Sequence, residues 1–429
     1  MYVSLNNGIK LYYEEYGNKN GDAILFLHGN EENNEIFNFF KDKLQKYHLY
    51  FIDSRCHGNS SYGTLSYDEM SLDIRLFINS LGIKKPHIVG FSDGAIIAIK
   101  LALIYPQLGK LFLIGPNIDP SGLTVDAIIE LRKENSIYSN LCLNEPHIKE
   151  SELSNIKSRS IIIGGEFDMI ESSHLELIKN NIPNSTLYIL KGLDHFVIKE
   201  DPIKILSIIE NELSINVFYE DNHIIVVEKK AGILSQEDKT KDPDILSLTK
   251  SYLKIKYEKP GNVYLGLVQR LDRNVSGLMV FAKTSKASAR LNENRPIKNY
   301  LAVVYGKMKD DKGTLVNHLL KDENKLIAYP SEDGKLSILH YETLKTNDNY
   351  SLLDVRIDTG RFHQIRCQLS LSGHSIYNDY KYNKNIEKND YSIALDAYKV
   401  SFLHPIFKEI ITISRYPEDE IFSSFDTIK

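Results

Sequence analysis

The chain has 429 residues, of which 42% are hydrophobic and 25% charged, and its formal net charge is −5. This is an ordinary globular composition, and no run approaches the roughly 18 apolar residues that a membrane span needs. Because single hydrophobic cores stop growing near about 250–300 residues, a chain of this length is expected to form two domains.

Neither the N-terminus nor the cysteines point to secretion. The opening residues, MYVSLNNGIKLYYEEYG, lack a basic stretch followed by an apolar block, so we expect no signal peptide. Cys56, Cys142 and Cys367 lie far apart, are odd in number and have no metal-like spacing. This pattern favours a reducing cytosol over a disulfide framework, so we expect a cytoplasmic protein.

The first half alternates strands and helices. Residues 2–17 predict a hairpin, because Asn7-Gly8 supplies the positive φ of a tight turn. Apolar, continuous strands follow, and helical stretches lie between several of them; such strands indicate a parallel sheet covered by helices on both faces. The predicted strands are 23–29, 48–54, 87–92, 111–116, 160–165 and 186–190, and the helices are 67–81, 93–105 and 201–213. We therefore predict an α/β domain over residues 1–213.

The pattern changes near Ser214. A hairpin at 216–229 and later strands joined by short turns indicate an α+β domain over 214–429 with a largely antiparallel sheet. The clearest of these later strands are 335–345 and 350–358, and the clearest helices are 244–257 and 362–371. The junction, NELSINVF, contains no Gly/Ser/Pro-rich linker.

Charge is divided unevenly between the halves. Residues 1–213 carry 20 Lys and Arg against 28 Asp and Glu, a net charge of −8, whereas residues 214–429 carry 32 against 29, a net charge of +3. Two interpretations stay open: drift in surface charge, or a polyanionic partner that meets only the second half.

The sequence VGFSDGAIIAIKLAL places a G-x-S-x-G motif between a predicted strand and a predicted helix. This turn would present the hydroxyl of Ser92 at the edge of the sheet. A serine nucleophile needs a histidine to take its proton and a carboxylate to orient that histidine. His195 and Asp168 each follow a predicted strand, in the order Ser, Asp, His. The backbone amides of Asn30 and Asp93 are the candidate oxyanion donors.

With these residues, the first half resembles the α/β-hydrolase family over essentially all of 1–213. IDSRCHGNSS also resembles that family's Asp-x-Arg-Gly-His-Gly-x-Ser segment, with Cys56 where glycine is usual. The segment from 115 to 161, where the family inserts its lid, is short. The resemblance implies a serine hydrolase with an ester-like, small-molecule substrate.

In the second half, RLDRNVSGLMVFAK places Asp272 beside arginines just before an apolar strand. Neighbouring arginines should depress the pKa of this carboxyl and keep it ionised. KNYLAVVYGK supplies Tyr300 for stacking on a base, and GRFHQIRCQLSLSGH supplies donors for phosphates. The candidate RNA-binding residues are Arg270, Tyr300, Arg361, His363, Gln364 and Arg366, and Arg366 is also a candidate partner for Asp272.

These separated motifs resemble the RluA family of pseudouridine synthases over about 216–425. The resemblance implies that Asp272 attacks the uridine and lets the base detach, rotate and rejoin through carbon 5. It implies that Tyr300 stacks on the uracil, that Arg366 holds Asp272 ionised, and that Arg270 fills the gap left by the flipped uridine. It implies RNA, either rRNA or tRNA, as the partner and no metal or organic cofactor.

Three positions depart from the family pattern. Histidine is usual where Gln269 stands, and threonine is usual where Phe362 stands. The family usually has Lys-Pro-Ala-Gly where this chain has Lys230-Ala231-Gly232 after Lys229.

The sequence therefore predicts a serine hydrolase fused to an RNA pseudouridine synthase. One alternative is a synthase whose first domain is a catalytically silent docking module. The other is an active esterase whose second half only binds RNA. Neither the oligomeric state nor any coupling between the sites follows from the sequence.

Overall fold

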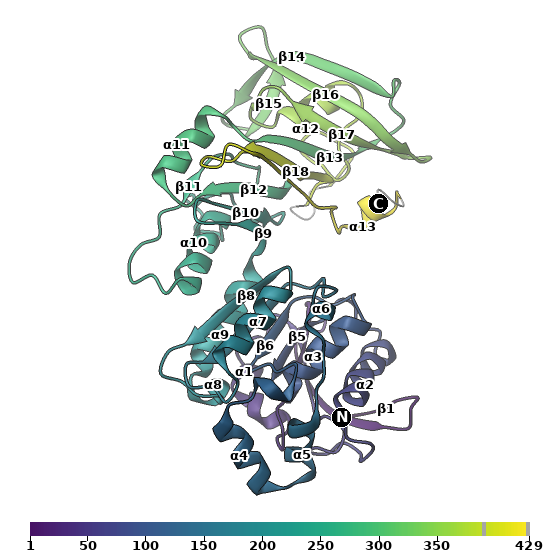
Figure 1. Ribbon diagram of the computed structural model, residues 1–429. Coiled ribbons are helices and arrows are strands. Elements are labelled where there is room, and N and C mark those ends of the chain that lie inside the picture. Colours follow the sequence, from purple (N-terminus) through teal and green to yellow (C-terminus); the bar gives the residue numbers. More distant parts are fainter. Residues whose placement is uncertain (388–391, 426–429) are drawn as a thin grey trace. The chain divides into compact units, whose positions relative to one another are not determined.

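The computed structural model describes residues 1–387 and 392–425. Internal contacts divide the chain into two compact units, Met1–Glu210 and Asn211–Lys429 (Figure 1). The first unit contains a mostly parallel sheet flanked by helices, and the second contains a mostly antiparallel sheet with fewer helices. The predicted fold class of each half is thereby confirmed.

The first unit is built on an eight-stranded sheet with the order β1-β2-β4-β3-β5-β6-β7-β8. The β1–β2 and β2–β4 pairs are antiparallel, and all other neighbours are parallel. The strands are β1 (Tyr2–Ser4), β2 (Lys10–Gly17), β3 (Ala23–Leu27), β4 (His48–Ile52), β5 (His87–Phe91), β6 (Leu111–Ile114), β7 (Ser160–Gly165) and β8 (Ser185–Leu190). The predicted hairpin and the six predicted apolar strands are therefore all present.

Both faces of this sheet are covered, as β3 illustrates. Leu25 and Leu27 belong to the same apolar cluster as residues of α2 and α3. Phe26, which points to the opposite face, lies with its ring centroid 5.1 Å from that of Phe37 and 6.0 Å from that of Phe40. Because every residue of β3 is buried, the strand is apolar throughout rather than alternating.

The helices of the first unit include the three that were predicted, which are α2 (Tyr67–Ser80), α3 (Asp93–Ile104) and α9 (Pro202–Ser214). The others are α1 (Asn38–Lys41), α4 (Val125–Glu134), α5 (Ile137–Asn144), α6 (Glu150–Leu153), α7 (Ser172–Asn181) and α8 (Val197–Glu200). The segment 115–161 contains α4, α5 and α6, none of which was predicted. Only Ala127 and Leu131 of α4 are buried, so its apolar face is too short to give a clear helical period.

The second unit is built on an eleven-stranded sheet. Nine of the strands follow the order β15-β14-β16-β17-β13-β18-β12-β10-β9, and the other two, β11 and β19, pair with β12 and β18. Only the β12–β18 pair is parallel. The strands are β9 (Asn216–Glu220), β10 (Ile224–Lys229), β11 (Gly266–Leu267), β12 (Ser276–Ala282), β13 (Ile297–Tyr305), β14 (Lys312–Asp322), β15 (Ile327–Pro330), β16 (Lys335–Thr346), β17 (Tyr350–Ile357), β18 (Leu395–Leu403) and β19 (Ile410–Ser414).

In the described part of the second unit, four helices accompany this sheet: α10 (Ile245–Lys256), α11 (Ser285–Glu293), α12 (Gln364–Leu371) and α13 (Glu420–Ser423). The first and third correspond to the two helices that were predicted here. In residues 1–387 and 392–425, none of the helices has both the length and the apolar character needed to cross a membrane.

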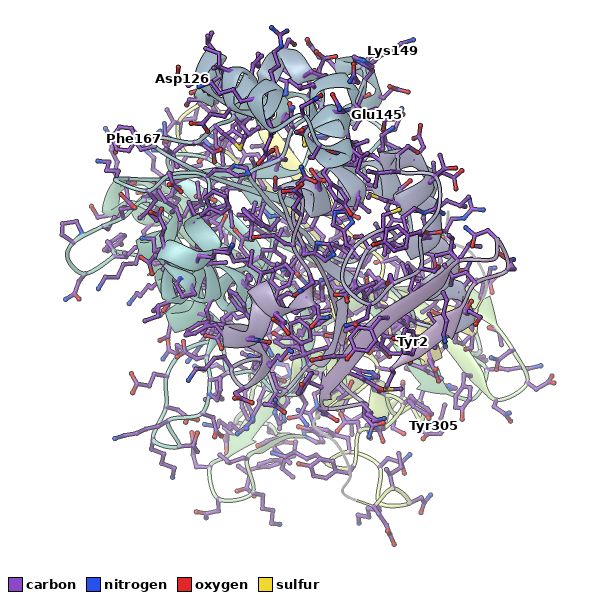
Figure 2. All side chains as sticks on the ribbon, turned by 90° about the horizontal axis from the view of Figure 1, so that it is seen from below. Tyr2, Asp126, Glu145, Lys149, Phe167 and Tyr305 are labelled. Carbon is purple, nitrogen blue, oxygen red and sulfur yellow. The ribbon has the colours of Figure 1, made fainter. Side chains whose placement is uncertain are left out.

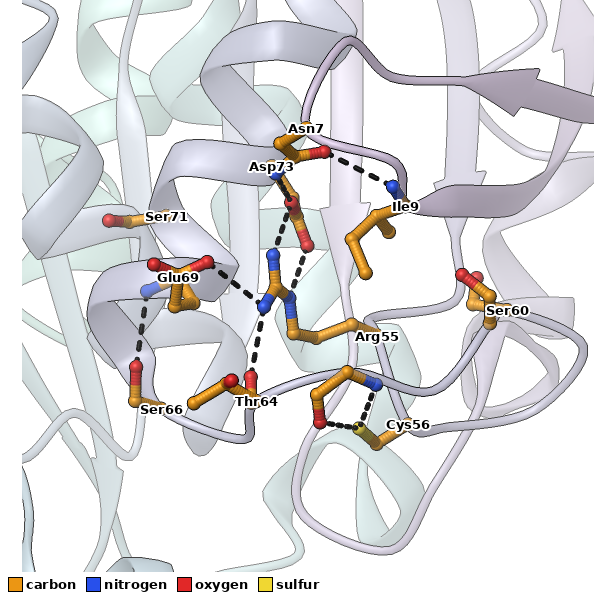
Figure 3. A network of polar contacts seen from close by, with 12 residues as sticks. Asn7, Ile9, Arg55, Cys56, Ser60, Thr64, Ser66, Glu69, Ser71 and Asp73 are labelled. Carbon is orange, nitrogen blue, oxygen red and sulfur yellow. Dashed lines mark hydrogen bonds and ion pairs between the residues drawn. The ribbon is translucent and has the colours of Figure 1, made fainter.

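A buried ion pair holds the loop after β4 against α2 (Figure 3). Arg55 Nε and Nη2 donate to the two carboxylate oxygens of Asp73 at 2.6 and 2.7 Å. Arg55 Nη1 donates to the carbonyl oxygen of Thr64 at 2.9 Å, and Asn7 Nδ2 donates to Asp73 at 2.8 Å. Cys56, the next residue, has a φ of 65°, which explains why glycine is usual at this position.

We expect Asp73→Ala to lower the free energy of unfolding of the first unit by about 3 kcal/mol, because the buried Arg55 guanidinium loses its bidentate carboxylate and keeps only Glu69, which is 43% exposed and lies 3.0 Å from Nη1. Asp68→Ala is the matched control. It also removes a carboxylate from α2, but that side chain is 81% exposed and pairs with Lys100 at the surface.

The measurement is urea unfolding of the full chain, followed by hydrogen exchange in peptides from residues 1–210. The control should cost less than about 1 kcal/mol. Equal costs for the two variants would show that the buried pair contributes no more than a surface pair.

Candidate active sites

Ser92 occupies a strained turn between β5 and α3. Its φ of 52° and ψ of −114° lie outside the regions that L-residues usually adopt. A Cβ atom at Gly90 would lie 2.3 Å from the carbonyl oxygen of Gly94, and one at Gly94 would lie 2.0 Å from that of Leu27. The glycines of the motif are therefore required by close backbone approach, and the turn they permit brings Ser92 to the end of the sheet.

The three predicted triad residues come together. His195 Nε2 lies 3.0 Å from Ser92 Oγ, and His195 Nδ1 lies 2.6 Å from Asp168 Oδ1. The backbone amides of Gly165 and Ile170 also donate to the Asp168 carboxylate, at 3.1 and 3.0 Å. This geometry lets the imidazole take the serine proton while the carboxylate orients the ring.

Asn30 and Asp93 each follow a strand of the sheet that carries Ser92. Asn30 follows β3 by three residues, and Asp93 is the first residue of α3. Their role as oxyanion donors stays a prediction. Beside Ser92 lies a small cleft with a volume of about 30 Å³, well below the range of drug-sized ligand pockets. It is lined by Tyr67, Asp93, Ile96, Gly115, Asn117, Leu123, Cys142, Glu145, Met169 and Ile170.

In the second unit, the segment that carries Asp272 runs between β11 and β12 and is fixed by residues that follow β10. The amide of Leu271 donates to Ser235 Oγ at 2.9 Å, and Ser235 Oγ donates back to the Leu271 carbonyl at 2.6 Å. Lys229 Nζ donates to the Arg273 carbonyl at 3.1 Å, and the Gly232 amide donates to the same carbonyl at 2.8 Å. The backbone on both sides of Asp272 is thus held in one conformation.

Arg366 lies beside Asp272 but is held mainly by another carboxylate. Its Nε and Nη2 donate to the two oxygens of Asp379, both at 2.7 Å. Its Nη1 lies 2.9 Å from His363 Nε2 and 3.6 Å from Asp272 Oδ2, and His363 Nε2 is also 3.6 Å from that oxygen. Asp379 therefore aims the guanidinium so that one nitrogen remains directed at Asp272.

The expected depression of the Asp272 pKa is wrong. Burial raises the pKa of this carboxyl above its ordinary value, and the lowering by Arg366 and Lys229 does not offset it. The sequence neighbours do not neutralise it either: Arg273 pairs with Asp242 at 2.7 Å, and Arg270 is exposed. The arginines next to Asp272 in the sequence suggested a lowered pKa. The sequence does not show that the carboxyl is buried, and burial has the larger effect on its pKa.

Two buried groups, Tyr300 and Lys229, interact electrostatically with Asp272, and a third, Lys298, acts on Lys229. Tyr300 on β13 is 8% exposed, and burial together with the Asp272 charge raises the pKa of its phenol. Lys229 is fully buried; burial lowers the pKa of its ammonium to about 7, while Asp272 raises it. Burial likewise lowers the pKa of Lys298 on β13 to about 7. Each of these groups favours its neutral form more than it would in water.

The remaining predicted RNA contacts divide into exposed and buried side chains. Arg270 and Arg361 are exposed and stay predictions as RNA contacts. Gln364 is 2% exposed; its Oε1 accepts from Thr359 and its Nε2 donates to the Ile338 carbonyl at 3.0 Å. Gln364 is therefore held by hydrogen bonds within the protein, and its contact with RNA stays a prediction.

His363 is also buried, and burial lowers its pKa, so its ring is neutral near pH 7. Phe362, one of the departures from the family pattern, stacks on His363 with ring centroids 3.9 Å apart and an interplanar angle of 16°. Gln269, another departure, donates its side-chain amide to the carbonyl of Pro296. Phe362 and Gln269, the two residues that differ here from the family pattern, therefore both contact other parts of the protein near the Asp272 segment.

Sequence reasoning missed Asp379, Ser235 and the role of Lys229. Asp379 lies five residues after the quoted stretch GRFHQIRCQLSLSGH, and no local pattern shows which arginine it meets. Ser235 and Lys229 are joined to the Asp272 segment only by the fold. Among the described residues, no group of three or more His, Cys, Asp or Glu side chains is arranged to hold a metal ion.

Two family descriptions match the chain: the alpha/beta hydrolase fold over residues 22–135 and RNA pseudouridylate synthase over residues 223–371. An uncharacterized RNA pseudouridine synthase from Synechocystis sp. is 29% identical over 235 residues, which cover 52% of this chain and 72% of that protein. The ribosomal large subunit pseudouridine synthase C of Buchnera aphidicola subsp. Baizongia pistaciae is 32% identical over 235 residues, covering 51% of this chain and 71% of that protein.

We expect Gly115→Ala to abolish labelling of Ser92 by a fluorophosphonate probe. Gly115 has a φ of 60°, and a Cβ atom there would lie 2.6 Å from Cε1 of His195, which would displace the imidazole from the serine. Gly192→Ala is the control, because Gly192 has a similar φ of 74° but open space around its Cβ position.

Labelling is measured as the rate of probe incorporation, with circular dichroism as the check on folding. The control should label within about 3-fold of wild type, since it adds only backbone strain of about 1–2 kcal/mol. Equal labelling of the two variants would contradict the close packing of His195 on Gly115.

Proposed function

The chain belongs to the RNA pseudouridine synthase family and carries an α/β hydrolase fold domain ahead of the synthase domain, and we propose that both domains are catalytic. In this proposal residues 214–429 isomerise uridine to pseudouridine in rRNA or tRNA, and residues 1–213 hydrolyse an ester-like small molecule. The observation that carries the first part is the placement of Asp272 on a segment fixed from both sides, with Arg366 and Tyr300 around it. The cytoplasmic location stays a prediction.

In the proposed isomerisation, the Asp272 carboxylate attacks the flipped-out uridine and the bond from ribose to the base nitrogen breaks. The freed uracil rotates and bonds to the ribose through carbon 5, which breaks the bond to Asp272 and frees the carboxylate; carbon 5 then loses its proton and the base nitrogen gains one. Tyr300 stacks on the ring; because burial and Asp272 raise the pKa of its phenol, it can help remove the carbon-5 proton only after losing its own. Arg366, aimed by Asp379, stabilises the ionised form of Asp272. Arg270 occupies the place of the flipped nucleotide.

In the proposed hydrolysis, Ser92 Oγ attacks the ester carbonyl while His195 takes the serine proton and passes it to the leaving alcohol. Water then releases the acid from the serine. The amides of Asn30 and Asp93 stabilise the oxyanion. The assembled triad favours this function over a silent docking module, because a domain kept only for docking needs no serine held 3.0 Å from an oriented imidazole.

Tritium release from carbon 5 of labelled uridine tests the synthase. We expect release by wild type from ribosomal RNA or tRNA, and release at background level by Asp272→Asn, which keeps the shape of the side chain but removes the nucleophile. Asp358→Asn is the control, since it removes a carboxylate from the same domain at a 45% exposed position, and it should release tritium as wild type does. No release by folded wild type that binds RNA would reduce this domain to a binding module.

The pH dependence tests the role of the Arg366–Asp379 pair. Tritium release requires ionised Asp272, so its rate should rise with pH as this carboxyl loses its proton. The double variant Arg366→Gln with Asp379→Asn removes both members of the pair and leaves no uncompensated buried charge. Because Arg366 lowers the pKa of Asp272 more than Asp379 raises it, the rise should move to higher pH. An unchanged pH profile in an active double variant would show that Arg366 does not stabilise the carboxylate.

A further inference from the structure

The cleft beside Ser92 has one acidic side. Asp93, only 3% exposed, lines this cleft; its Oδ1 accepts from Tyr67 Oη at 2.7 Å. Its other oxygen, Oδ2, is buried and has no hydrogen-bond partner within the described part of the chain. A buried carboxylate oxygen without a partner is costly, so a group that donates to it would bind with a substantial gain.

The charged residues that line the cleft are acidic. A second carboxylate, Glu145, lines the same cleft, and neither Lys nor Arg is among the described residues that line it. Burial raises the pKa of Asp93 to about 6, and Tyr67, Cys142 and His195 partly oppose this. Asn30 does not line the cleft, but its Nδ2 donates to the lining residue Cys142 at Sγ, at 3.3 Å, and its side-chain oxygen is also buried without a partner in residues 1–387 and 392–425. The charged groups that line the cleft itself are the carboxylates of Asp93 and Glu145.

The position of Asp93 fixes where a matching donor would sit. Asp93 follows the nucleophile directly in the chain, and the charge of His195 acts on it, so a substrate group that reaches it must lie close to the carbonyl that Ser92 attacks. Apolar side chains of Ile96, Leu123, Met169 and Ile170 also line the cleft. A matching acyl group would carry a donor for Asp93 and would otherwise be small and apolar, because the cleft itself is small.

We propose that the first domain hydrolyses esters of small α-amino acids, with the substrate's primary ammonium bound by the free carboxylate oxygen of Asp93. This proposal rests on the hydrolase function proposed above and names its substrate class. The ester bond breaks after attack by Ser92, the alcohol leaves with the proton from His195, and one water releases the amino acid. The reaction consumes one ester and one water and yields one amino acid and one alcohol.

Three benzyl esters of nearly equal shape test the proposal: those of L-alanine, L-lactic acid and 2-methylpropanoic acid. They place an ammonium, a hydroxyl or a methyl group on the carbon beside the carbonyl. The measurement is kcat/KM from benzyl alcohol release by the full chain. Wild type should prefer the alanine ester over the methylpropanoate ester by about 10-fold or more, the scale of one charged hydrogen bond.

Variants are compared by this ratio, so that a general loss of activity cancels. Asp93→Asn keeps an acceptor for Tyr67 and should bring the ratio close to 1. Asp126→Asn is the control; Asp126 is exposed on α4, where Figure 2 shows it at the outer edge of the unit, so the ratio should stay at the wild-type value. A ratio lowered equally by both variants would indicate long-range electrostatics and overturn the proposed contact.

The other outcomes are also decisive. Equal or faster hydrolysis of the methylpropanoate or lactate ester by wild type overturns the proposal without any variant. So does fluorophosphonate labelling of Ser92 with no turnover of the three esters, which would keep the hydrolase but not this substrate class. No labelling of folded wild type would instead overturn the hydrolase function itself.

Discussion

A charged side chain that is buried away from water needs a partner of opposite charge, and both halves of the chain contain such a buried pair. The Arg55–Asp73 pair closes the loop after β4, and the Arg366–Asp379 pair aims a guanidinium at Asp272. In both pairs the arginine donates two hydrogen bonds to one carboxylate, an arrangement that fixes the orientation of the guanidinium plane. The proposed nucleophile, Asp272, makes a longer contact of 3.6 Å with Arg366, and its side chain stays 29% exposed.

Both proposed nucleophiles stand on backbone that the rest of the fold determines. Ser92 adopts strained dihedral angles that its flanking glycines allow, and Asp272 lies on a segment tied to Ser235 and Lys229. The strained dihedral angles of Ser92 and the hydrogen bonds that hold the Asp272 segment have the same consequence: each orients the proposed reactive atom before a substrate binds. This preorganisation reduces the entropy that must be lost at the moment of reaction.

The parts of the chain that could be predicted are those in which short local patterns carry the information. The parallel strands of the first half are continuous apolar runs, and the triad follows from a serine motif and two residues at strand ends. The helices in segment 115–161 were missed because their apolar faces are short. The raised pKa of Asp272, the burial of Gln364 and the partner of Arg366 were missed because they depend on contacts between distant segments. Local sequence indicates which chemical groups are present, but burial decides how they behave.

The central claim is that Asp272 converts uridine into its carbon-linked isomer and that this chemistry is separate from the chemistry at Ser92. The most direct measurement is mass spectrometry of the nucleosides from RNA that has been incubated with the full chain. It counts an isomer of uridine that has the same mass as uridine. This isomer keeps its base under conditions that cleave the glycosidic bond of uridine. The account predicts that wild type and Ser92→Ala form this isomer at equal rates and that Asp272→Asn forms none. Formation by Asp272→Asn, or its loss in Ser92→Ala, would contradict the account.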